Sequence, residues 1–181
     1  MALKATIFKS DLQIADMDRH YYATHSLVIA RHPSENDERM MVRLLAFALH
    51  ASESLAFTKG LSDTEEPDIW QKDLTGAIEL WIELGQPDEK RIRQACGKAR
   101  QVAVFTYSGN SADVWWKGIA SKLERLDNLQ VINVPVEMTH TLAALANRNM
   151  QLQCTIQDGQ VWLADNSQSI ETHFSILKPF K

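Results

Sequence analysis

A carboxylate inside an apolar run is the first feature of this sequence that points to chemistry. Glu83 lies within residues 78–84, beside Trp81, in a stretch whose composition predicts a core strand. Burying an unpaired charge is costly, so such a carboxylate usually has an ionic partner, a proton or a metal ion. Glu83 is therefore a candidate site residue. The alternative is that strand alternation places Glu79 and Glu83 together on a solvent-exposed face.

A predicted hairpin brings a second acid to Glu83. If Thr75-Gly76 forms a two-residue turn, the flanking strands pair so that Asp68 lies opposite Glu83. If residues 63–68, which are rich in acids, instead begin a short helix through Trp70, this pairing is lost. Asp73 then replaces Asp68 as the partner of Glu83.

Glu38 is a third acid, in line with a predicted buried helix face. The sequence predicts a helix that begins near Ser34 as its N-cap and carries apolar residues at helical spacing. Glu38 precedes Leu45 by two helical turns, so both side chains project toward nearly the same side. Glu38 is therefore a candidate site residue. The alternative is a first-turn acid that the helix dipole stabilises.

Arg91 is a candidate cation for the same site. Pro87 marks the start of a helix whose buried face includes Ile92 and Ala95. Arg91 flanks this face, and its side chain is long enough to reach the end of the strand that carries Glu83. The alternative is that Arg91 is a solvated helix charge.

Length and composition fit a globular protein. The chain has 181 residues, 45% hydrophobic and 23% charged, and its formal net charge of −4 is unlike that of a strong nonspecific nucleic-acid binder. Its two cysteines, Cys96 and Cys154, have no metal-site spacing, and no apolar run is long enough for a membrane span. We therefore expect a cytoplasmic protein with no membrane partner.

The order of predicted elements indicates an α/β (α+β) fold. We expect one domain, residues 1–181, with a mixed central sheet flanked by helices and extended by extra strands at both ends. Its consecutive parts are the N-terminal strands, a core and a C-terminal helix with strands: residues 1–31, 32–134 and 135–181. An Asp158-Gly159 turn predicts a hairpin within residues 150–164, and one more strand is expected at 169–177.

The predicted hairpin resembles a known motif. Pro67-Asp68, followed after residues 69–82 by Glu83-Leu84-Gly85, resembles the signature of the PD-(D/E)XK nuclease superfamily, with glycine where that motif has lysine. Over nearly its whole length the sequence resembles the YaeQ family. The resemblance rests on HPSENDERMMVRLLAF (32–47), EPDIW (66–70), LWIELGQPDEKRIRQAC (80–96), FTY (105–107) and LQCTIQDGQVWL (152–163). It implies a restriction-endonuclease-like α/β roll, a PD-(D/E)XK variant with added strands.

The superfamily resemblance also implies site residues. In an active nuclease of this kind, acids hold Mg²⁺ or Mn²⁺ ions that polarise the phosphate and activate water, and the lysine helps to place that water. The catalytic candidates are Asp68, Asp73, Glu83 and Arg91, and the metal-ligand candidates are Glu38, Asp68, Asp73 and Glu83. Because Gly85 departs from the lysine position, Arg91, Lys72 or Lys98 stands in for it, or no residue does. Arg91 stays protonated and is suited only to stabilising charge.

Two functions stay open at this point. The first is a Mg²⁺- or Mn²⁺-dependent phosphodiesterase that acts on nucleic acid, motivated by the acids within apolar elements and by the resemblance. The second is a non-catalytic interaction or regulatory protein with a protein partner, on a nuclease-like scaffold. It is motivated by Gly85, the negative net charge and the lack of a dense strip of basic residues.

Overall fold

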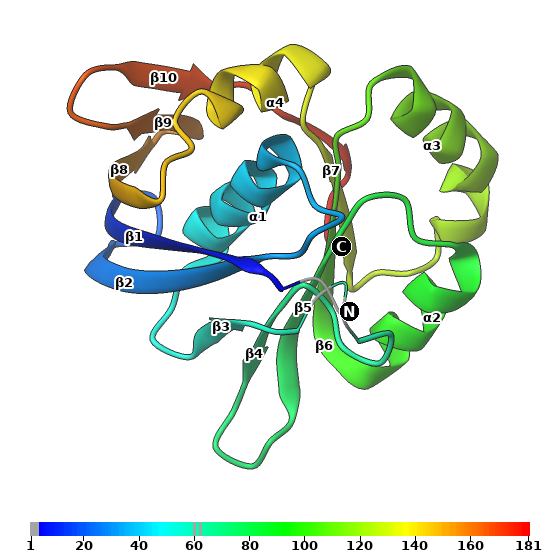
Figure 1. Cartoon of the computed structure of the whole chain (residues 1–181). Coiled ribbons are helices and arrows are strands. Elements are labelled where there is room, and N and C mark those ends of the chain that lie inside the picture. The colour runs from blue at the N-terminus through cyan, green and yellow to red at the C-terminus, as the bar shows by residue number, and fades with distance from the viewer. Residues whose placement is uncertain (1–3, 60, 62) are drawn as a thin grey trace. The chain divides into compact units, whose positions relative to one another are not determined.

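Strands from the two ends of the chain form one sheet, and strands from its middle form most of a second (Figure 1). The computed structural model describes residues 4–59, 61 and 63–181. Contacts divide the chain into a first unit, Met1–Ser52 with Glu137–His173, and a second unit, Glu53–Val136 with Phe174–Lys181. Each unit contains one mixed sheet. The expectation that the chain acts as a single domain stays a prediction.

The first unit contains a five-stranded sheet in the order β10-β9-β8-β1-β2. Its strands are β1 (Thr6–Asp16), β2 (Tyr21–Arg31), β8 (Asn149–Gln157), β9 (Gln160–Ala164) and β10 (Ser169–Thr172). β1 runs parallel to β8, and the other neighbours are antiparallel. The β8–β9 turn has positive φ at Asp158 (54°) and Gly159 (76°), as a two-residue hairpin turn requires, which confirms this predicted hairpin.

One face of this sheet is apolar, because the strand residues that point inward are mostly hydrophobic and alternate with outward polar residues. Leu12 and Ile14 of β1 are buried, whereas Asp11 and Gln13 are exposed. Helix α1 (Asp37–His50) buries Met40 to Ala48, and Phe47 contacts the His25 ring of β2 edge-on, with centroids 5.2 Å apart. Helix α4 (Val136–Ala143) precedes β8.

The second unit contains a six-stranded sheet in the order β11-β7-β6-β5-β4-β3. Its strands are β3 (Leu55–Phe57), β4 (Ile69–Lys72), β5 (Ile78–Leu84), β6 (Ala99–Thr106), β7 (Leu129–Asn133) and β11 (Ser175–Lys178). The central strands β5, β6 and β7 are parallel, and the remaining pairs are antiparallel. Parallel neighbours need crossover connections, which the helices α2 (Glu89–Lys98) and α3 (Asn110–Leu123) provide.

Both crossover helices of the second unit pack on the same face of its sheet (Figure 1). Ile92 of α2 and Ile119 of α3 belong to one buried cluster with Val102 and Val104 of β6. Alternate residues of β5, β6 and β7 therefore point toward these helices. This arrangement decides which side chains meet at the carboxyl ends of the parallel strands.

The mixed α/β class is confirmed, and the described residues include four helices flanking two mixed sheets. Two details of the prediction were wrong. The strand expected at 169–177 is two strands, β10 and β11, which belong to different sheets. The N-cap of α1 is Asn36 and not Ser34, because the Asn36 side chain accepts the Arg39 amide at 2.9 Å. Among the described helices, none is long and apolar enough to cross a membrane.

Candidate functional site

The β4–β5 hairpin has the predicted register. Ile69 lies opposite Ile82 and Trp70 opposite Trp81. The predicted two-residue Thr75-Gly76 turn is wrong: the Asp73 amide donates to the Ala77 carbonyl at 2.9 Å, so residues 74–76 form the turn. A register shift between Gln71 and Lys72 accommodates the extra residue. Trp70 is thus in a strand, so the alternative of a helix through this residue is wrong. The register brings Asp68, the residue before β4, next to Glu83.

Asp68 is buried and fastens the hairpin. Only 5% of its surface is exposed. Its Oδ2 accepts the Leu84 amide at 2.8 Å, and its own amide donates to the Ile82 carbonyl at 3.0 Å. The carboxylate therefore ties the start of β4 to the end of β5.

Glu83 is buried within a network of donors and does not lie on a wet face. Its Oε1 accepts the Trp81 indole N–H at 3.0 Å and lies 2.8 Å from Nε and 2.7 Å from Nη2 of Arg91. Burial raises the pKa of the Glu83 carboxyl above its ordinary range, and the neighbouring charge of Asp68 adds to this rise. The bonds from Arg91 and the Trp81 indole oppose the rise.

Arg91 joins Glu83 to the segment that precedes the hairpin. It lies in the first turn of α2, where its amide donates to the N-cap Asp88 at 2.8 Å. Its Nη1 donates to the Thr64 carbonyl, and its Nη2 donates to the Glu66 carbonyl at 3.0 Å. One guanidinium therefore holds a buried carboxylate and two backbone carbonyls, which matches its fork of donors.

The backbone at the position of the motif lysine disfavours any residue with a side chain. Gly85 has φ +107°, a region that residues with a Cβ rarely adopt, and its amide donates to the Phe105 carbonyl at 2.8 Å. The turn that follows β5 therefore favours glycine at this position.

The remaining candidates lie elsewhere. Asp73 is exposed at the opposite end of β4, where its Oδ1 accepts the Thr75 amide and hydroxyl at 2.8 and 2.6 Å. The Thr75 hydroxyl bond lowers the pKa of Asp73, as expected for a turn-capping carboxylate. Glu38 is half-buried in α1 and belongs to the first unit, whereas Asp68 and Glu83 belong to the second.

The two lysine candidates contact tryptophan rings. Lys72 Nζ lies 3.8 Å from the centre of the Trp70 ring, and Lys98 Nζ lies 6.0 Å from that of Trp81. Lys98 also lies 3.8 Å from an exposed carboxylate oxygen of Glu65. Both lysines are thus placed for cation–π contacts, and whether either stands in for the motif lysine stays a prediction.

The donor set around Glu83 is a structural network as it stands. Across residues 4–59, 61 and 63–181, no three or more His, Cys, Asp or Glu side chains come together closely enough to hold a metal ion. Within the second unit, Asp68 and Glu83 supply two carboxylates, and each has an oxygen engaged by protein donors. Both carboxylates are therefore already hydrogen-bonded within the protein.

Almost the whole chain matches the model of one protein family. Residues 1–174 match the model of the family described as "YaeQ protein". This chain belongs to the YaeQ family. It is 47% identical over 175 residues to the "Uncharacterized protein YaeQ" of Escherichia coli (strain K12), with 97% of each chain covered. It is also 47% identical to the corresponding protein of Salmonella typhi over 171 residues, 94% of each chain.

Solved YaeQ structures have the same fold. The crystal structure of YaeQ protein from Xanthomonas axonopodis pv. citri matches with a TM-score of 0.93 and 48% identity, covering 96% of this chain and 98% of that chain. The YaeQ protein from Pseudomonas syringae matches with a TM-score of 0.92 and 34% identity, covering 97% of each. The predicted family is therefore confirmed.

Glu35 is a further buried acid of this YaeQ family member, and sequence reasoning missed it. Glu35 is 6% exposed, and its two carboxylate oxygens accept from Arg39 and Arg43 at 2.6 and 2.7 Å. It lies before α1 and next to exposed loop residues, so no apolar run marked it. The spacing Glu35, Arg39, Arg43, with one helical turn between successive members, is the signal that would have found it.

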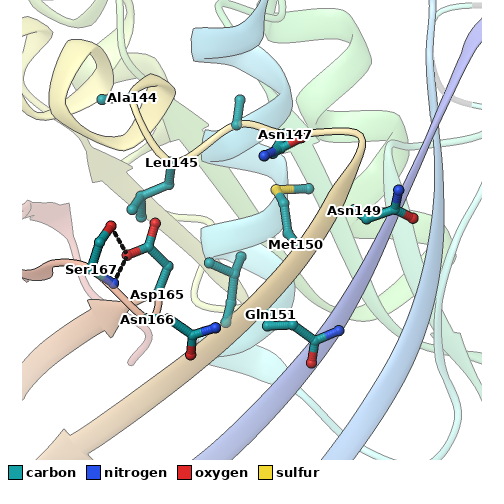
Figure 2. Close-up of a pocket in the computed structure, with 11 residues that line it drawn as sticks. Ala144, Leu145, Asn147, Asn149, Met150, Gln151, Asp165, Asn166 and Ser167 are labelled. Carbon is teal, nitrogen blue, oxygen red and sulfur yellow. Dashed lines mark hydrogen bonds between the residues drawn. The ribbon is translucent and has the colours of Figure 1, made fainter.

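The first unit also has a polar pocket of about 240 Å³ (Figure 2). Asn147, Asn149 and Gln151 line one side, and the loop of Asp165 and Ser167 lines another. The Asp165 carboxylate accepts the amide and hydroxyl of Ser167 at 2.8 and 3.0 Å, which closes its own turn. The one acid in this lining therefore serves loop structure.

Proposed function

We propose that this YaeQ family member is a binding protein that uses a nuclease-like scaffold and does not hydrolyse phosphodiesters. The observation that carries the proposal is the pairing of Arg91 with Glu83, at 2.8 and 2.7 Å. A metal-dependent hydrolase needs this carboxylate for its cation. Here a permanently protonated side chain holds the carboxylate and neutralises its charge.

The restriction-endonuclease-like interpretation is part of this proposal. It is supported by the order α1, β3, β4, β5, α2, β6 along the chain and by Asp68 and Glu83 at one end of the β4–β5 hairpin. The conformation of Gly85 supports the loss of hydrolysis, because the backbone there disfavours any residue with a side chain, lysine included.

The Glu83–Arg91 pair gives a binding surface a fixed position. Through Thr64 and Glu66, Arg91 anchors residues 63–66, which we call the acidic segment. Asp63 Oδ1 accepts the Glu65 amide at 2.8 Å, and the Glu65 side chain is 82% exposed. Ordered carboxylates on the surface favour a basic partner, because complementary charge speeds and orients association. The proposed partner is therefore a protein with a lysine- or arginine-rich segment.

A peptide titration tests the binding half of this proposal. A lysine-rich peptide is titrated into the parent protein and into the double variant Glu65→Gln/Glu66→Gln. We expect the double variant to bind at least about tenfold more weakly at low salt. The matched control is Glu124→Gln/Glu137→Gln, which removes two exposed acids elsewhere and should bind like the parent. Equal affinity of the parent and the segment variant would remove the acidic segment from the proposal.

A specific observation favours a second candidate, the Mg²⁺- or Mn²⁺-dependent nuclease. Asp68 lies close enough to Glu83 for its charge to help raise the pKa of Glu83. Mg²⁺ is often bound through one or two carboxylates together with substrate phosphates. On this view, nucleic acid completes the site, and Arg91 leaves Glu83 to stabilise charge on the phosphate.

Cleavage assays separate the two candidates. Single- and double-stranded DNA and RNA are incubated with the parent in Mg²⁺ and in Mn²⁺, beside calorimetric Mn²⁺ titrations with and without an oligonucleotide. We expect neither cleavage nor Mn²⁺ binding. Cleavage that disappears in Glu83→Gln and persists in Glu79→Gln would establish the nuclease and overturn the non-hydrolytic proposal.

A further inference from the structure

The carboxyl ends of β6 and β7 hold two polar atoms without a hydrogen-bond partner in the described part of the chain. Thr106, the last residue of β6, is completely buried, and its Oγ1 has none. Asn133, the last residue of β7, has a buried Oδ1 in the same situation. Buried polar atoms are nearly always satisfied, so two orphans call for an explanation.

These two atoms are neighbours on one face of the sheet. Thr106 and Asn133 are partners in the β6–β7 register. They alternate with Val104 and Val131, which pack in the cluster that contains residues of α2 and α3. Their side chains therefore project to the side of the sheet that carries α3.

The N-terminus of α3 lies just beyond Thr106. Its N-cap is Gly109, with φ 61°, and no side chain caps it within the described residues. The first intrahelical bond is from the Asp113 amide to the Gly109 carbonyl at 3.0 Å, so the amides of Asn110, Ser111 and Ala112 precede the helical ladder. Such amides, together with the helix dipole, attract oxygen anions.

The loop after β5 lies against the first turn of α3. Gln86 Nε2 and the Ser111 hydroxyl are 2.8 Å apart, which fixes the first turn of α3 against the loop after β5. A side chain at Gly109 would meet Val136 Cγ2 at 3.4 Å. Asp113 is the one acid in the first turn, and it is exposed to solvent. In open α/β sheets, ligands bind outside the carboxyl ends of parallel strands.

We propose that Thr106, Asn133 and the first-turn amides of α3 form a binding site for a small molecule with an oxyanion group and a neighbouring O–H or N–H donor. The Thr106 hydroxyl and the α3 amides donate to the oxyanion, and Asn133 Oδ1 accepts from the donor. This chemistry fits a phosphate or a carboxylate. The site does not depend on the function proposed for Glu83, since it uses none of the same side chains.

Nuclear magnetic resonance on the full chain tests the site. Inorganic phosphate, which carries a P–OH donor near neutral pH, and acetate are titrated separately at constant ionic strength. The amide signals of Asn110, Ser111 and Ala112 are followed. We expect saturable shifts with phosphate. If acetate causes shifts as large as those with phosphate, the ligand class includes carboxylates. If the acetate shifts are smaller, the ligand is a phosphate. The absence of saturable shifts with both would overturn the proposal.

Two variants link the shifts to the orphan groups. Thr106→Val keeps the side-chain shape and removes the hydroxyl, and should weaken phosphate binding about tenfold or more. Asn133→Asp places a negative charge beside the anion and should weaken it further. The matched control is Thr141→Val, an exposed threonine on α4 whose hydroxyl donates to the Glu137 carbonyl, and should bind phosphate like the parent.

Thermal unfolding without phosphate separates a ligand site from a structural water. Removing a hydroxyl that has no partner in the folded protein breaks no hydrogen bond. Thr106→Val should therefore have a melting temperature equal to or above that of the parent. The reference is Thr172→Val, which removes a buried hydroxyl bonded to the Val161 carbonyl at 3.0 Å and should melt lower. If Thr106→Val melts as low as Thr172→Val and still binds phosphate like the parent, a structural water satisfies the hydroxyl and the proposal is wrong.

Discussion

On one face of the second unit's sheet, the end of β5 differs from the neighbouring ends of β6 and β7 in whether its buried polar groups have hydrogen-bond partners. At the end of β5, Glu83 meets the indole of Trp81 and the guanidinium of Arg91. At the ends of β6 and β7, Thr106 Oγ1 and Asn133 Oδ1 have no partner among the described residues. A satisfied network fixes structure, whereas buried polar atoms without partners call for an explanation, which the proposed oxyanion site supplies. The end of β5, which resembles a catalytic motif, is thus the one whose polar groups are hydrogen-bonded within the protein.

The largest test of this comparison is to remove Glu83. In Glu83→Ala, the Arg91 charge and the Trp81 N–H lose their common acceptor. We expect a loss of about 2–4 kcal/mol in the free energy of unfolding, measured by urea denaturation. Glu79→Ala is the control, because Glu79 pairs at 3.4 Å with an Arg100 side chain that is 78% exposed, and it should change stability by less than about 0.5 kcal/mol. Equal small effects would mean that the Glu83 network is not structural.

The next largest effect is expected when Arg91 is replaced. Arg91→Met leaves Glu83 without its cation and frees the acidic segment, with an expected cost of about 1–3 kcal/mol. Because the Thr64 and Glu66 carbonyls lose their anchor, proteolysis within residues 63–66 should also become faster. The control is Arg100→Met. An unchanged cleavage rate in Arg91→Met would show that the segment is held by other contacts.

A smaller effect is expected at Gly85. Because its φ is +107°, Gly85→Ala should cost about 1–2 kcal/mol, although no heavy atom outside the adjacent residues lies within 4 Å of the added Cβ. Gly85→Lys restores the motif residue and should cost the same, without giving DNA or RNA cleavage. Gly97→Ala in α2 is the control and should stabilise by up to about 1 kcal/mol. Cleavage by Gly85→Lys would show that only the lysine is missing from a working site.

Local patterns in the sequence predicted the hairpin and its acids. Strand alternation predicted the β4–β5 register, and hence the pairing of Asp68 with Glu83, although the turn is one residue longer than predicted and a register shift before Lys72 compensates for it. The reach of Arg91 followed from helix geometry. The division into two sheets could not be predicted in this way, because β1 pairs with β8 through partners such as Lys9 and Asn149. Such long-range pairing depends on the whole fold.

The second polar strand end left no signal in the sequence. Thr106 and Asn133 end apolar strands, where polar residues are common and usually solvated. Only the register places them side by side, and only burial shows that their oxygens lack partners. Glu38 shows the converse limit. Its helical position was predicted, but its relation to Asp68 depends on how two separate units are arranged.

The smallest expected effect is a pH dependence that one strand end has and the other lacks. Burial raises the pKa of Glu83 above its ordinary value of 4.5, so the folded chain binds this proton more tightly than the unfolded chain. Stability from this group is fully present below pH 4.5 and is lost as pH rises through the raised pKa. Glu83→Gln cannot titrate, so the free energy of unfolding of the parent should fall relative to that of Glu83→Gln across this interval. It should then level off.

Urea denaturation at a series of pH values between about 4 and 8 measures this difference. Thr106→Val is the control, because a threonine hydroxyl does not titrate in this range and its difference from the parent should stay constant. If the parent instead gains stability relative to Glu83→Gln as pH rises, the attraction of Arg91 outweighs burial and Glu83 is held as a stable anion. That result would make its carboxylate a better cation ligand and would move the comparison toward the nuclease.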